Sequence, residues 1–393
     1  MKEKLYIFDT TLRDGAQTYG VDFNVDEKKI LASKLDQLGV DYIEGGWPGA
    51  NATDTQFFNE KIEFKKSTFT SFGMTKKSGR SAENDPGLAS LMNANTPSVC
   101  VVGKSWDFHV DVALEISNEE NLENIAQSVS FLSKNNKEVH FDAEHFFDGY
   151  KSNPEYAIQC LKAAIDNGAR WVVLCDTNGG TLPNEVETIV SEVVNSIPGE
   201  KLGIHAHNDT GNAVANSLSA VRSGVRQIQG TINGLGERCG NANLISLIPT
   251  FLLKPEYSKT YDLSIEAGKL DQLTELSRLL DEILNRVPNR TAPYVGSSAF
   301  AHKGGLHVSA VNKDPKTYEH IDPQLVGNRR QIIISEQSGK SNIVSRLKSA
   351  GITVDEDDKT IQKILDRVKE REFNGYSYDG ADASFEILVK KVL

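Results

Sequence analysis

The sequence predicts an α/β protein: a (β/α)8 barrel followed by a mostly helical C-terminal subdomain. Eight short apolar segments alternate with eight longer amphipathic segments between Leu5 and Leu253, which is the pattern of repeated βα units. Ile158, Leu161 and Ile165 show the helical period within one amphipathic segment. An open doubly wound sheet is the alternative, but eight consecutive units without a switch point favour closure of the sheet into a barrel.

The predicted elements alternate in order along the chain. The strands are expected at residues 5–12, 42–47, 68–74, 98–102, 139–146, 171–175, 202–207 and 227–232. The helices are expected at residues 25–38, 54–65, a segment ending at 88–93, 119–133, 154–167, 183–195, 213–223 and 242–253. Gly39, Gly168 and Gly224 each follow one of these helices, where a left-handed cap favours glycine.

The alternation stops after residue 253. Segments 264–285, 340–350 and 358–372 are expected to be helices, and residues 383–389 alternate apolar and polar side chains as a strand does. We therefore expect a barrel domain over residues 1–285, a linker and helical subdomain over 286–375, and the beginning of a further domain over 376–393.

Composition narrows the class of protein. The 393 residues are 39% hydrophobic and 25% charged, as in soluble globular proteins, and the net charge is −11. This charge disfavours nucleic acid or an anionic membrane surface as a partner. The chain contains neither a long apolar run nor a signal-like start, and its four cysteines show no Cys-x-x-Cys spacing. These features predict a cytoplasmic protein.

A metal site is predicted around two histidines of the seventh strand. His205 and His207 are two residues apart, so their side chains point to the same side of a strand. Two imidazoles so placed can bind one ion at about 2.0–2.1 Å per bond. Two ordinary histidines at a strand end are the alternative. The Asn208-Asp209 pair that follows and the acidic turn at Asp14 favour the metal.

Polar and ionisable residues follow the other strands as well. In a (β/α)8 barrel the chemistry lies where the strands end. The residues expected at that rim are Arg13, Asp14, Glu44, Glu144, His145, Asp176, Thr177, Asn178, Glu237, Arg238 and Asn241.

Four motifs stand in order along the chain: residues 9–15 (DTTLRDG), 205–209 (HAHND), 236–241 (GERCGN) and 304–307 (GGLH). They resemble the signatures of the Claisen synthases that join an acyl-CoA to a 2-oxo acid, the family of the 2-isopropylmalate, homocitrate and citramalate synthases. The resemblance runs in register over residues 5–341. Segments 9–17 and 42–50 are most similar to the citramalate synthase branch, although Ala16 stands where the relatives usually have Glu.

This resemblance implies a reaction. Acetyl-CoA would condense with a 2-oxo acid, most simply pyruvate, to give citramalate and CoA in isoleucine biosynthesis. A 2-isopropylmalate or homocitrate synthase is the alternative. A hydroxymethylglutaryl-CoA-type lyase is less favoured, because such lyases carry a Gly-Cys-Pro loop and Cys239 is followed by Gly240.

The resemblance also implies the site residues. The metal ligands would be Asp14, His205, His207 and Asn241, a mixed nitrogen and oxygen set that suits Mn²⁺, Mg²⁺ or Zn²⁺. Arg13, with Asp14, would bind the substrate, and Arg13 would stabilise the oxyanion that develops.

Three further residues are expected to act on substrate or proton. Thr177 would donate a hydrogen bond to the substrate carboxylate, or else cap a helix. Glu144 would remove the acetyl methyl proton, alone or with His307, or else be a buried salt-bridge partner. His307 and Tyr318 would come from the neighbouring subunit of a homodimer.

Two expectations concern specificity and regulation. Asp142 stands where we expect an apolar or small residue beside a pyruvate methyl group, so it is either a salt-bridged core acid or a group that tunes the acceptor. In this family a regulatory domain that binds an amino acid often follows the catalytic part. Residues 376–393 are expected to be only its beginning, so the chain is expected to ignore isoleucine and leucine.

Overall fold

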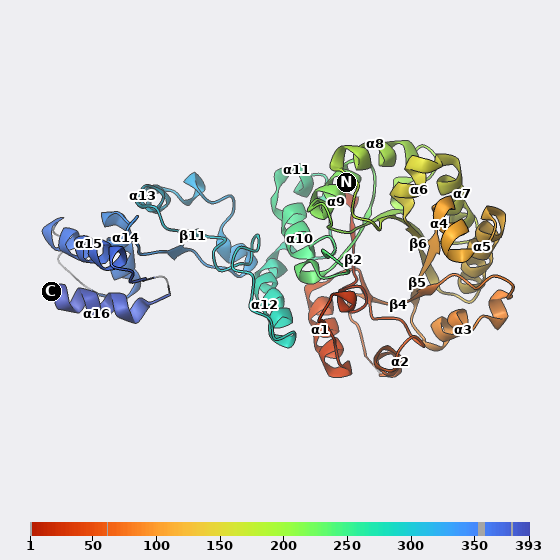
Figure 1. Ribbon diagram of the computed structural model, residues 1–393, viewed down its shortest axis with the longest axis horizontal. Coiled ribbons are helices and arrows are strands. Elements are labelled where there is room, and N and C mark those ends of the chain that lie inside the picture. The colour runs from red at the N-terminus through yellow and green to blue at the C-terminus, as the bar shows by residue number, and fades with distance from the viewer. Residues whose placement is uncertain (1, 61, 353–357, 379) are drawn as a thin grey trace. The chain divides into compact units, whose positions relative to one another are not determined.

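A closed barrel of eight parallel strands forms the first part of the protein. The computed structural model describes residues 2–60, 62–352, 358–378 and 380–393. The strands are β2 Tyr6–Asp9, β3 Tyr42–Glu44, β4 Thr68–Met74, β5 Ser98–Lys104, β6 Glu138–Glu144, β7 Trp171–Asp176, β8 Leu202–Ala206 and β9 Gln227–Gly230. Figure 1 shows them as a ring enclosed by helices. The predicted barrel is confirmed, and the open-sheet alternative is wrong, because β2 pairs with both β3 and β9.

The helices between the strands are close to those predicted. They are α1 Val25–Leu38, α2 Ala52–Asn59, α3 Pro86–Asn93, α5 Asn118–Lys134, α7 Pro154–Ile165, α8 Pro183–Val193, α9 Ala213–Arg222 and α10 Leu244–Leu253. Helix α2 ends at Asn59, earlier than expected, and Lys61 of the predicted segment lies outside the described residues.

Helix α1 shows how local sequence sets such boundaries. Asn24 and Glu27 form a reciprocal capping box at its start, and Gly39 closes it with a φ of 95°.

Three short helical segments in the loops after β5 and β6 were not predicted. The chain leaves β5 through α4 Asp107–His109 and a π-helix at Val110–Leu114, and it leaves β6 through α6 Phe146–Ser152. Residue His145, between β6 and α6, has a positive φ of 58°, a conformation that costs a non-glycine residue about 1–2 kcal/mol. These loops belong to the rim where the strands end.

Side chains fill the barrel interior below that rim. The Phe8 ring on β2 lies 5.0 Å from the His140 ring on β6. These strands are not neighbours in the ring, so the contact crosses the inside of the barrel. Tyr42 and Phe72 pack against Phe8 in the same buried cluster, and the interior is therefore a packed core with no open channel at this level.

Residues 271–275 and 288–393 form a second compact unit. It contains a parallel pair of short strands, β11 Ala301–His302 and β12 Gln331–Ile332. Its longer helices are α13 Gly305–Lys313, α14 Lys340–Ser349, α15 Asp358–Phe373 and α16 Asp382–Val392. The expected helix 264–285 is divided into a 3-10 turn at Ala267–Gln272 and α12 Leu273–Ile283. None of the described helices is long and apolar enough to cross a membrane.

The strand predicted at residues 383–389 is wrong, because this segment lies in α16. Phe385, Leu388 and Val389 are buried and follow the i, i+3, i+4 spacing of a helix. They pack in one cluster with Ile343 of α14 and Ile364 of α15. Phe385 and Val389 are four residues apart, so they share a face in either a strand or a helix, and the helical partners decide between the two.

Substitution in α16 tests this packing. Because Phe385 is 1% exposed, we expect Phe385→Ala to lower the free energy of unfolding of the second unit by about 3–5 kcal/mol. The control is Ile387→Ala on the same helix, where the side chain is 53% exposed and the change should stay within about 0.5 kcal/mol. Urea unfolding with hydrogen exchange over residues 382–392 measures both, and equal effects would contradict the helical packing.

Candidate active site

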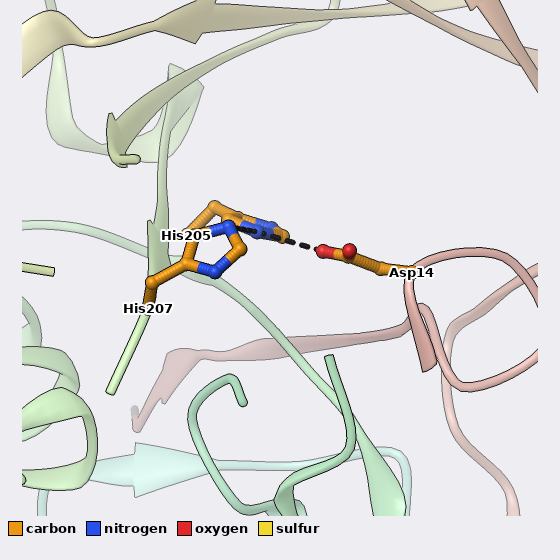
Figure 2. A group of neighbouring side chains, drawn as sticks. All are labelled: Asp14, His205 and His207. Carbon is orange, nitrogen blue, oxygen red and sulfur yellow. Dashed lines mark hydrogen bonds and ion pairs between the residues drawn. The ribbon is translucent and has the colours of Figure 1, made fainter. Parts of the chain in front are cut away.

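Asp14, His205 and His207 converge at the C-terminal rim of the barrel. Asp14 lies in the turn after β2, His205 is on β8, and His207 follows β8 directly. The Nε2 atom of His205 lies 3.1 Å from Oδ2 of Asp14 and 3.4 Å from Nε2 of His207. Figure 2 shows both rings and the carboxylate turned toward one another. One ligating atom of each residue lies within 4.8 Å of the other two, which a single ion with bonds of about 2 Å can bridge.

Asn241 joins this group from the loop after β9. It forms an isolated backbone bridge with His207, and its Nδ2 donates to Oδ2 of Asp14 at 2.7 Å. Its Oδ1 is buried without a hydrogen-bond partner among the described residues. A half-turn of the amide exchanges these two atoms and turns an oxygen ligand toward Asp14. The donor set, two imidazole nitrogens and two oxygens, therefore fits a divalent cation.

The local environment keeps Asp14 ionised and His207 neutral, which are the forms that bind a metal. Burial would raise the pKa of Asp14, but Arg13 and His205 outweigh it and hold that pKa well below its ordinary value. Burial, followed by the charge of His205, lowers the pKa of His207 to about 3. Burial alone would lower the pKa of His205, but the hydrogen bond and charge of Asp14 raise it above the ordinary value. A metal would have to displace a proton from His205 at low pH.

A buried chain of hydrogen bonds orients His205. Its Nδ1 lies 2.8 Å from Oε1 of Gln229 on β9, and Nε2 of Gln229 donates to Oδ1 of Asp142 at 3.0 Å. Since the Gln229 oxygen can only accept, Nδ1 carries the proton of the neutral ring, and Nε2 is the nitrogen left for a metal. Asp142 is a buried acid that accepts from Gln229, and it also lines the cavity, so its expected role in tuning the acceptor stays a prediction.

Arg13 lies beside these candidate metal ligands and contacts two carboxylates and an aromatic ring. Its Nε lies 2.7 Å from Oε2 of Glu44, and its Nη1 lies 3.6 Å from Oδ1 of Asp14. The guanidinium carbon lies 4.0 Å from the centre of the Phe72 ring. Burial raises the pKa of Glu44 to about 7, although Arg13 opposes the rise. Two acids and one aromatic face thus hold the guanidinium at the edge of the cavity.

Arg13, Asp14, His205 and His207 line one cavity of about 340 Å³. Its lining combines the charged group with apolar side chains from the ends of β3, β4 and β5, among them Trp47, Phe72, Met74 and Val102. The cavity is therefore polar where Arg13 and the histidines lie and has an apolar wall as well.

Glu144 and Thr177 also line this cavity. Glu144 forms an ion pair with Lys104, the last residue of β5. The Thr177 hydroxyl accepts a hydrogen bond from the backbone N–H of His145 at 2.8 Å, so its own proton is available to a ligand. Thr177 does not cap the following helix, whose N-cap is Leu182, and the capping alternative for Thr177 is wrong.

His307 and Tyr318 lie in the second unit. Their rings stack on each other with centroids 4.0 Å apart, and both side chains are exposed. The structure thus brings together Arg13, Asp14, Glu144, Thr177, His205, His207 and Asn241 in one cavity and its wall, and it pairs His307 with Tyr318 separately.

Sequence reasoning missed Lys104 and Gln229. Lys104 ends a strand, so the rule that chemistry lies at strand ends could have found it. No local signal marks Gln229, because its role depends on the alignment of β8 with β9, where His205 pairs with Gln229.

Comparison with known proteins defines the class. A family model described as HMGL-like matches residues 4–277, and one described as homocitrate synthase post-HMGL domain-like matches residues 294–374. The first match covers more than half of the chain, so this chain belongs to the HMGL-like family.

Within that family the chain is similar to curated (R)-citramalate synthases along its whole length. The enzyme of Aquifex aeolicus is 52% identical over 393 residues, which are 100% of this chain and 74% of the relative. The enzyme of Synechocystis is 48% identical over 100% of this chain and 72% of the relative. The 2-isopropylmalate synthase of Sulfurisphaera tokodaii is 33% identical over 99% of this chain and 96% of the relative.

Solved structures agree on the barrel. The HMG-CoA lyase of Bacillus subtilis superimposes with a TM-score of 0.62 at 20% identity, over 74% of this chain and 97% of that chain. An HMG-CoA lyase of Acinetobacter baumannii, solved with coenzyme A and 3-methylmalate, has a TM-score of 0.61 at 22% identity, over 74% of this chain and 94% of that chain. At this identity the likeness concerns the fold alone.

The role of Gln229 can be tested by metal binding. Gln229→Met keeps the length of the side chain but removes the acceptor for His205 Nδ1, so Mn²⁺ should bind about 10–100-fold more weakly. The matched control is Gln227→Met on the same strand, since Gln227 contacts His140 instead. Calorimetric titration of the metal-free protein measures both, and equal affinities for the Gln229 variant and wild type would contradict the assignment.

Proposed function

We propose that this protein is an acyltransferase that condenses acetyl-CoA with pyruvate and releases citramalate and CoA. The observation that carries the proposal is the cluster of candidate metal ligands beside Arg13 in one cavity. The whole of this chain also aligns with (R)-citramalate synthases. We further propose that it acts in the cytoplasm, where both substrates are available, as a step toward isoleucine.

The polar side of the cavity would bind the 2-oxo acid. Asp14, His205, His207 and Asn241 would hold a divalent cation, Mn²⁺, Mg²⁺ or Zn²⁺, which supplies Lewis acidity to the keto group. Arg13 is fixed by Glu44 and Asp14, so its free N–H groups would face the oxygen at C2 as negative charge develops there. Thr177 would donate its hydroxyl proton to the substrate carboxylate.

The apolar wall would select a small acceptor. Phe72, Met74 and Val102 approach the cavity from β4 and β5, and they offer the methyl group of pyruvate an apolar contact. A longer acceptor side chain, as in 2-oxoisovalerate, would have to displace these side chains.

Glu144 is the proposed base for the methyl group of acetyl-CoA. It lines the same cavity as Arg13 and Thr177, and the ion pair with Lys104 fixes its carboxylate. A base needs to lie within hydrogen-bond reach of the proton that it removes, and the end of β6 gives Glu144 that position at the rim.

His307 and Tyr318 are proposed to complete the site of a neighbouring subunit in a homodimer. Their stacked rings are exposed on the second unit, so their polar atoms are available to a partner. This proposal rests on the family resemblance of the 304–307 motif.

The reaction can be tested by CoA release. We expect pyruvate to be used at least about 10-fold more efficiently than 2-oxobutyrate, 2-oxoisovalerate or 2-oxoglutarate, because one extra methylene in a fitted pocket changes the free energy by about 1–3 kcal/mol. Exhaustive chelation should abolish turnover, and Mn²⁺ or Mg²⁺ should restore it. Preference for 2-oxoisovalerate would replace the proposal by isopropylmalate synthesis, and full turnover without metal would overturn the metal site.

Shared active sites can be tested by mixing variants. Arg13→Ala and His307→Ala should each lose at least about 100-fold in kcat. After mixing and subunit exchange, about a quarter of wild-type activity should return, since half of the dimers are hybrids with one intact site of two. The control mixture, Arg13→Ala with Asp14→Asn, should recover nothing because both changes lie in the barrel. No recovery in the first mixture would show that His307 acts within its own subunit.

A further inference from the structure

A second group of titratable side chains adjoins the cavity. His109, Glu144 and His145 each offer a ligating atom within 4.8 Å of the others. The rings of His109 and His145 meet edge to face at 4.6 Å. Of these three residues, only Glu144 lines the cavity, so it joins the cavity to the two histidines behind it.

The local backbone holds these groups in place. His109 ends α4 where the chain enters the π-helix, an uncommon segment that often marks functional sites. His145 keeps its left-handed conformation while its N–H donates to Thr177. A Cβ atom on Gly149 of α6 would clash with the Ser105 carbonyl, so the two rim loops pack backbone against backbone.

The group is unsuited to a metal ion. The Lys104 ammonium already forms an ion pair with the Glu144 carboxylate. A divalent cation bound between the histidines and Glu144 would lie beside that positive charge and be repelled by it. The chemistry that remains for two imidazoles and a carboxylate within 4.8 Å of one another is proton transfer, directly or through one water.

His109 is the member that can receive a proton. Its Nδ1 is buried and has no hydrogen-bond partner among the described residues. Burial, followed by the charges of Lys104 and His145, lowers the pKa of His109, so the ring is neutral near pH 7. His145 differs, because its Nδ1 lies 3.3 Å from a carboxylate oxygen of Asp148.

We propose that His109 is the proton outlet of this site, taking from Glu144 the proton removed from acetyl-CoA and passing it to solvent. The assignment rests on the proposed function, in which Glu144 is the base. His109 acts through Glu144 and does not itself touch the substrate.

Glu144 must lose the proton that it takes before it can act in the next turnover. The methyl C–H bond breaks, its electron pair stays on the carbon as the enolate, and an O–H bond forms on Glu144. That O–H bond then breaks as an N–H bond forms on His109, and the half-buried ring yields the proton to water. The alkoxide formed at C2 takes its proton from water, and hydrolysis of the thioester by water gives the second carboxylate, CoA and the one net proton of the turnover.

The test compares His109→Gln with Phe108→Leu. Glutamine keeps the polarity of His109 but cannot carry a proton. Phe108 is an exposed neighbour on the same turn and serves as the control. For His109→Gln we expect kcat for CoA release to fall at least about 10-fold with the KM for pyruvate unchanged. The solvent deuterium isotope effect on kcat should rise, and added imidazole should restore part of the rate. Phe108→Leu should match wild type in all four measurements.

Each contrary result points to a different assumption. A His109→Gln enzyme with kcat within twofold of wild type would overturn the outlet. So would a slower enzyme that imidazole does not rescue and whose solvent isotope effect is unchanged, since that is the behaviour of a structural residue. An active Glu144→Gln variant would overturn both the assignment of Glu144 as the base and the assignment of His109 as the proton outlet. A wild-type protein that releases no CoA from any 2-oxo acid would overturn the proposed function itself.

Discussion

Pairing between the first and last barrel strands is the constraint on which the site depends. Strand β2 aligns with β9 from Tyr6 opposite Gln227 to Asp9 opposite Gly230. This register closes the ring and brings the turn after β2 to the loop after β9, so that Asn241 can donate to Asp14 across 227 positions of sequence. In a parallel barrel all strands end at one rim, and closure is what brings residues from both ends of the barrel sequence into one cavity.

The charges gathered at that rim explain why the site can be buried. Arg13 is attracted by Glu44, Asp14 and Asp142, and these charges more than offset the burial that would lower its pKa. A buried ion that lost its partners would be costly, so the guanidinium and the carboxylates stabilise one another. These carboxylates lie near one guanidinium in a site proposed to bind a cation next to an anionic substrate.

The sequence was sufficient for the barrel and for the placement of the two central histidines. The alternation of short and long segments reproduced every barrel strand, and the His-x-His spacing placed His205 and His207 on one side of β8. Contacts that depend on register between strands could not be read locally: the Gln229 contact to His205 exists only because β8 and β9 align as they do. The strand predicted at the position of α16 was wrong for a related reason. The spacing of its buried side chains fits both a strand and a helix, and only the packing partners decide between the two.

The exact direction of Glu144 is likewise a property of its neighbours and not of β6 alone. Its backbone carbonyl accepts from the Ser105 hydroxyl at 2.8 Å and from the Ser105 N–H at 3.1 Å. His145, the next residue, donates its backbone N–H to the Thr177 hydroxyl in the loop after β7. Loops from both adjacent strands therefore fix the backbone at Glu144, while Lys104 fixes its carboxylate. The proposed base, held in this way, would need little reorganisation when a substrate arrives. The loops after β5, β6 and β7 would thus have a role that the barrel strands by themselves cannot supply.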